Sequence, residues 1–104
     1  MIPCICINDK NQPIPKHRQV KEGNPYHVTH IYIMKKMGNI LGCDIYEAPL
    51  GKDCLPCEQF RLDRFSFTED ALKDLIQLAY DCGELNDFDM DKVREFAKEQ
   101  LEEA

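Results

Sequence analysis

The sequence predicts an α+β fold: a small antiparallel β-barrel over residues 1–67, followed by two α-helices over residues 68–104. A length of 104 residues suits one domain. The spacing of apolar residues changes from a period of two to a period of 3.6 near residue 68. The charge changes there as well, from 9 basic and 7 acidic residues before this point to 4 and 12 after it.

The strands are predicted from short β-prone runs that are separated by turn residues. Residues 2–7 form the first strand, and residues 26–34 and 40–47 form an antiparallel hairpin around a turn at 35–39. Residues 60–67 form the last strand, with room for a helical turn at its start. The proline-bearing segments between these runs are predicted to be loops.

Alternation along the second strand assigns its side chains to faces. Tyr26 and Val28 point one way, and His30 is a candidate to follow them. His27 and His30 are three residues apart, so they are expected on opposite faces and cannot share one metal ion.

The first predicted helix has one apolar face and well-defined ends. Thr68 alone, or Ser66 together with Glu69, can cap its first turn, and Gly83 can end it in a left-handed conformation. Its apolar stripe has the spacing i, i+3, i+4 and i+7. The stripe consists of Leu72, Leu75, Ile76 and Ala79.

The second predicted helix starts at Asp87 or Asp89, either of which can cap it. Its apolar face consists of Met90, Val93, Ala97 and Leu101, with Phe96 beside them. Isolated helices of about 12–15 residues are marginal in water, so both stripes must pack on the barrel or on a partner. The four stripe residues of the first helix are therefore the candidate partner-binding residues.

Composition limits the location of the protein. No apolar run approaches the roughly 20 residues of a membrane span. Residues 1–10 show neither a basic region nor a long apolar region of the kind found in a signal peptide. We therefore expect a cytoplasmic protein that does not associate with membranes.

Six cysteines leave three interpretations open. A zinc site can be assembled from Cys4 and Cys6, which share one face of a strand, together with Cys54 and Cys57. A redox pair at 54–57 lacks the βαβ context that such a motif requires. Buried cysteine is common, and the favoured expectation is core thiols with no metal or other cofactor.

The remaining chemistry is limited. The rings of Tyr26, Tyr32, Tyr46 and Phe60 could stack on nucleotide bases, and a basic cluster lies at 16–21. A net charge of -6 nevertheless makes nucleic acid an unlikely partner. No nucleophile–base pair, phosphate loop or HExxH motif is visible, so the sequence does not predict an enzyme.

Several short motifs in residues 2–67 resemble those of one group of proteins. They are the Cys-Ile-Asn-Asp run at 6–9, the segment at 20–28, Gly-x-Ile-Leu-Gly at 38–42, and Phe60 followed by Asp-Arg-Phe at 63–65. In this order they resemble uncharacterised small SH3-like barrel proteins of gut Bacteroidetes and of their phages or prophages, and also Tudor- and KOW-type barrels. The resemblance implies an SH3-like barrel and no function, because a fold alone does not define an activity.

These observations lead to a hypothesis about function. We expect a non-enzymatic protein-binding, adaptor or inhibitor protein that acts on another protein, a host protein if a phage or prophage encodes it. Its acidic helices could imitate the phosphates of a nucleic acid. The alternatives are a small barrel that binds nucleic acid and a structural module stabilised by zinc.

Overall fold

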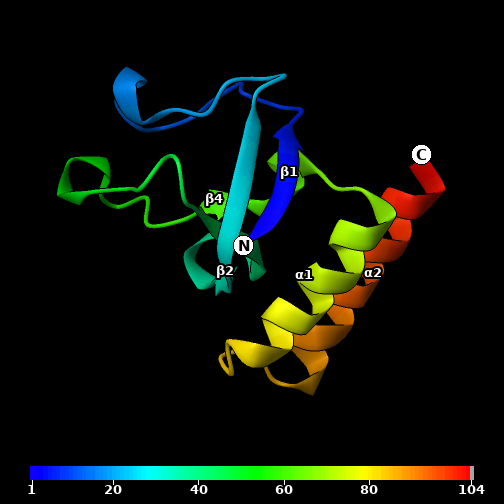
Figure 1. Ribbon diagram of the computed structural model, residues 1–104. Coiled ribbons are helices and arrows are strands. Elements are labelled where there is room, and N and C mark those ends of the chain that lie inside the picture. Colours follow the sequence, from blue (N-terminus) through cyan, green and yellow to red (C-terminus); the bar gives the residue numbers. More distant parts are fainter. Residues whose placement is uncertain (104) are drawn as a thin grey trace.

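The computed structural model describes residues 1–103, in which a five-stranded antiparallel sheet precedes two helices (Figure 1). The strands are β1 (Ile2–Cys6), β2 (Pro25–Met34), β3 (Ile40–Ile45), β4 (Phe60–Arg61) and β5 (Phe65–Ser66). The helices are α1 (Glu69–Asp81) and α2 (Asp87–Glu103). The predicted α+β class is therefore confirmed.

The sheet is curled but open. Its strand order is β4-β3-β2-β1-β5, so β4 and β5 lie at opposite edges, and among residues 1–103 no ladder joins them. Only the 3₁₀ turn Leu62–Arg64 separates these strands in the chain. Four Cα steps span at most about 15 Å, whereas a flat five-stranded sheet is about 19 Å wide, so the sheet must curl.

The predicted antiparallel sheet is present but is not closed into a barrel, and the single last strand predicted at 60–67 is wrong. The chain between β4 and β5 forms a 3₁₀ turn, and each of these strands is only two residues long. The predicted hairpin is present, with the 3₁₀ turn Lys35–Met37 and a left-handed Gly38 between β2 and β3.

A β-bulge in β2 corrects one predicted face. The pairing with β3 shifts between Val28 and His30, which moves the alternation by one residue. As a result Ile31 is the next buried residue after Val28, while His27 is half-buried and His30 is exposed. The two histidines therefore do not lie on opposite faces.

The helices begin and end largely through local side chains. The Thr68 hydroxyl accepts a hydrogen bond from the Ala71 amide, and Gly83 follows α1 with a φ of 67°. For α2 the predicted aspartate caps are wrong, because Asn86 Oδ1 accepts from the Asp89 amide. Asparagine is among the strongest capping residues, and the chain enters the helix one residue earlier than expected.

One apolar core joins the sheet to the helices. It includes Val28, Ile31 and Phe65 from the sheet, Leu75 from α1 and Val93 from α2. Figure 1 shows the two helices side by side on one side of the sheet, with the long loops on the other side. Leu101 was predicted to belong to this core but is 47% exposed in the last turn of α2. Among residues 1–103, no helix has the length and apolar character of a membrane span.

Candidate functional site

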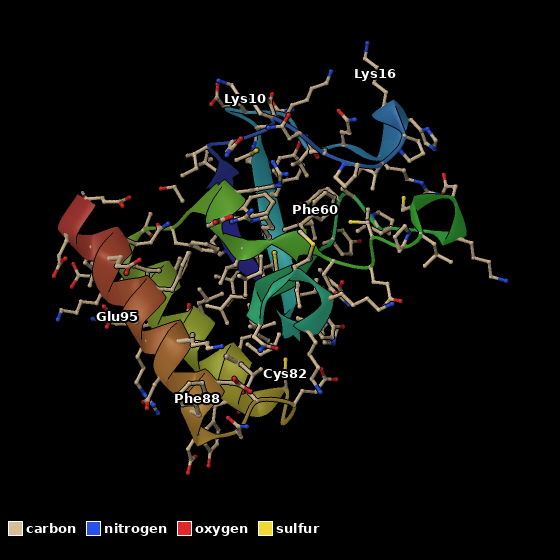
Figure 2. All side chains as sticks on the ribbon, turned by 180° about the vertical axis from the view of Figure 1, so that it is seen from behind. Lys10, Lys16, Phe60, Cys82, Phe88 and Glu95 are labelled. Carbon is tan, nitrogen blue, oxygen red and sulfur yellow. The ribbon has the colours of Figure 1, made fainter. Side chains whose placement is uncertain are left out.

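Segments from both ends of the sheet line an open groove with a volume of about 1070 Å³. Four segments contribute to its lining, within residues 8–14, 32–37, 56–64 and 84–89. These segments are far apart in the chain and meet only through the sheet order. The side chains of Lys10 and Phe60, labelled in Figure 2, come from two of these segments.

One wall of the groove depends on a glycine. The side chain of Met34 lies so close to Gly42 that a Cβ there would be 2.5 Å from Met34 Cγ and 2.8 Å from Sδ. Gly42 therefore allows Met34 to lie across β3, and Met37 follows it with 52% of its surface exposed. Methionine adapts its shape to varied apolar partners, so this wall can accommodate different side chains.

Lysines stand around the groove without ion partners. Lys10, Lys35 and Lys36 all line the groove and are exposed. Among residues 1–103 none of the three forms a salt bridge, although Arg61 pairs with Asp63 at 2.8 Å. The groove lining therefore carries these three lysines beside an apolar wall, together with four acidic residues, Glu58, Asp63, Glu84 and Asp89.

The loop that forms one side of the groove is held by hydrogen bonds between side chains and backbone. Gln12 donates to the Asp9 and Val20 carbonyls and accepts from the Val20 amide. Arg64 donates to the carbonyls of Asn8 and Lys10. These bonds explain how a proline-bearing loop without regular structure keeps a defined shape.

A polar cluster joins Tyr32 of the groove lining to His30 and Asp44, which line a smaller hollow of about 320 Å³. The Tyr32 hydroxyl donates to Asp44 at 2.8 Å, and the His30 ring stacks on the Tyr32 ring. Burial raises the pKa of Tyr32, and the hydrogen bond to Asp44 raises it further, so the phenol stays protonated at neutral pH. The cluster therefore holds Tyr32 as a hydrogen-bond donor and does not activate it as a nucleophile.

The stripe proposed for partner binding belongs to the core of the monomer. Leu72, Leu75 and Ala79 are at most 2% exposed, while Ile76 is half-buried and packs against the same core. The helix pair packs on the sheet of its own chain, and this removes the three buried residues from any partner's reach. The groove replaces the stripe as the candidate binding surface.

The cysteines proposed for zinc do not come together. Cys4 and Cys6 share the buried face of β1, as their spacing predicts, while Cys54 is buried in the 3₁₀ turn Lys52–Cys54 and Cys57 is half-buried. Among residues 1–103 no group of three or more potential ligands could hold a metal ion. Burial, with smaller contributions from Glu47 and Cys6, raises the pKa of Cys4 to about 12, so this thiol is protonated at neutral pH in the metal-free chain.

Several of the residues proposed for nucleic-acid binding are buried or already bonded within the chain. Tyr26 and Phe60 are 8% and 4% exposed, so they cannot stack on bases. In the basic cluster at 16–21, Arg18 donates to the Pro49 carbonyl and pairs with Asp53. Tyr46 remains exposed, and it lines the smaller hollow rather than the groove.

No family model, no curated protein and no solved structure matches this chain. The function must therefore be argued from the site itself. Sequence reasoning missed Met34 and Arg64 as site residues. The only signal for either was Gly42, because glycine inside a strand often marks a close approach of another group.

Proposed function

We propose that this chain is a non-enzymatic protein-binding adaptor or inhibitor whose partner docks in the groove. The observation that carries the proposal is the open wall of Met34 and Met37 beside unpaired lysines. Concave sites that combine apolar side chains with a few polar groups are the usual places for ligand binding. The inner faces of the helices are packed in the core, whereas the groove combines a concave lining with the exposed side chain of Met37.

We also propose that the sheet is an SH3-like barrel that has remained open. The strand order, with β5 beside β1 and a single 3₁₀ turn between the edge strands, supports this assignment. The resemblance to barrels of gut Bacteroidetes and their phages stays a prediction, and so does a host protein as the target. Binding residues are disproportionately found on loops held by a rigid scaffold, and loop residues within 8–14 and 56–59 line the groove.

A photo-crosslinker in the groove tests this function. We would replace Met37 by a photoreactive amino acid, with a matched probe at Leu101, which is exposed to a similar degree (52% and 47%) but lies on α2. The expected result is one protein from the source cells, captured at position 37 and not at 101, and lost in a Lys35→Glu/Lys36→Glu variant. Equal capture at both positions would show that the groove is not the binding surface.

A further inference from the structure

Arg64 is a buried cation without a carboxylate partner. Its residue is 8% exposed, and it ends the 3₁₀ turn between β4 and β5. One terminal nitrogen donates to the Asn8 carbonyl at 3.1 Å and to the Lys10 carbonyl at 2.7 Å, and the other donates to the Asn11 carbonyl at 3.3 Å. Among residues 1–103, it is absent from the ion pairs that the other three arginines form.

The guanidinium of Arg64 has donors to spare. It carries five N–H groups, and the three carbonyls take three of them. The Nε–H and one terminal N–H therefore remain, and the residue lines the groove. Carbonyl oxygens satisfy hydrogen bonds without neutralising a full charge, and a buried charge is costly until an opposite charge approaches it.

The surroundings of Arg64 favour an anion over a second cation. Lys10, whose carbonyl Arg64 holds, lines the groove with an exposed side chain and no ion partner among residues 1–103. The nearest carboxylate in the sequence, Asp63, is held by Arg61 through two hydrogen bonds of 3.2 and 2.8 Å. Three other acidic residues, Glu58, Glu84 and Asp89, also line the groove, and among residues 1–103 none of them pairs with Arg64.

We propose that Arg64 and Lys10 form an anion-binding subsite that receives the carboxylate of an aspartate or glutamate in an extended peptide of the partner. This inference rests on the proposed function, since it names the chemistry that the groove would recognise. A planar guanidinium suits a carboxylate because it can offer two parallel donors. The apolar neighbours of that acidic residue would lie along the wall of Met34 and Met37.

A pair of synthetic peptides tests the subsite. The probe is a capped hexapeptide of alternating leucine and glutamate, and its control has glutamine in place of glutamate. NMR titration of the full chain follows the Arg64 Nε–H signal. We expect the acidic peptide to shift this signal and to bind at least about tenfold more tightly, because hydrogen bonds between charged groups are worth roughly 1.5–3 kcal/mol.

Matched variants distinguish binding at the Arg64–Lys10 subsite from nonspecific electrostatic attraction between the peptide and the protein. Lys10→Gln should weaken the acidic peptide about three- to tenfold, whereas Lys16→Gln, which removes the same charge from the same loop outside the groove, should not. Arg64→Lys keeps the positive charge but loses the planar guanidinium. In a variant whose loop stays folded, it should therefore lower the affinity for the acidic peptide. If Arg64→Lys unfolds the chain, the comparison of Lys10→Gln with Lys16→Gln still tests the subsite.

The outcomes distinguish this inference from the proposed function. Equal binding of both peptides, with loss on Met37→Glu, would support the groove and overturn the anion subsite. No binding of the acidic peptide at millimolar concentration would also overturn the subsite, while the crosslinking result would still stand for or against the groove. Tighter binding of a short oligothymidylate than of the acidic peptide would overturn it in favour of a nucleic acid.

Discussion

The inner face of α1 and the wall of the groove are both apolar, but only the first is covered. Leu75 on α1 is fully buried against the sheet, whereas Met37 in the groove is 52% exposed. Figure 2 shows Phe88 on α2 at the opposite end of the molecule from Lys10, and the groove lining reaches from Lys10 to Asp89 in the first turn of α2. The same kind of side chain therefore stabilises the fold in one region and stays available for a partner in the other.

The largest expected effect is the loss of the helix packing. Leu75→Ala should lower the free energy of unfolding by about 2–5 kcal/mol, because it removes buried contacts and leaves a cavity. Met37→Ala and Asp74→Ala change exposed residues and should stay within about 0.5 kcal/mol. Urea unfolding measures all three variants, and an equally mild Leu75→Ala would mean that α1 adds little to the core.

Gly42 contributes to both the folded sheet and the groove. It belongs to β3, and its lack of a side chain leaves room for Met34 in the groove wall. Gly42→Ala should cost about 1–3 kcal/mol, because the new Cβ meets the side chain of Met34. In a Met34→Ala background the same change should cost much less. Thermal unfolding of the four proteins of this cycle gives the coupling between the positions. Additive costs would show that Met34 does not lie over Gly42 in solution.

The smallest change in stability is expected from the polar contact between Glu47 and His27 on the exposed side of the sheet. Burial alone would raise the pKa of Glu47, but hydrogen bonds from the His27 ring and amide outweigh it and hold this pKa below its usual value. A lowered pKa stabilises the fold above the unfolded value of about 4.3, and that stability is lost as the pH falls through the folded value.

His27→Gln tests this contact. The stability difference between the wild type and the variant should be below about 1 kcal/mol near pH 5, because the pair is partly exposed, and it should shrink toward pH 3. Urea unfolding across this pH range measures the difference. A difference that grows at lower pH would contradict the assigned direction of the pKa shift.

Much of the helical part could be predicted because its signals are local. Leu72, Leu75 and Ala79 are buried at the predicted spacing, and Thr68 caps α1. Errors appeared where two local signals competed, as at the start of α2, where Asn86 caps in place of Asp87 or Asp89. Leu101 follows the apolar spacing, but the last turn of α2 extends beyond the core.

The sheet was harder to predict because its details depend on pairing between distant segments. The bulge that exposes His30 follows from the register between β2 and β3, and a period of two in one strand does not show it. The open edge between β4 and β5 depends in the same way on the 3₁₀ turn Leu62–Arg64. The candidate site depends on contacts between segments that are even further apart in the sequence, since Arg64 donates to carbonyls more than 50 residues away in the chain.

By itself, the sequence determined the order of the first three strands and the two helices, the apolar face of α1 and the acidic character of the C-terminal third. These properties follow from residues close together in the chain, through periodicity, capping and charge. Only the tertiary structure decided that the helix stripe is covered by the chain's own sheet, that the four candidate zinc thiols stay apart, and that Lys10, Met34 and Arg64 line one groove. The physical reason is that a curled sheet brings together side chains whose distance in the sequence carries no periodic signal.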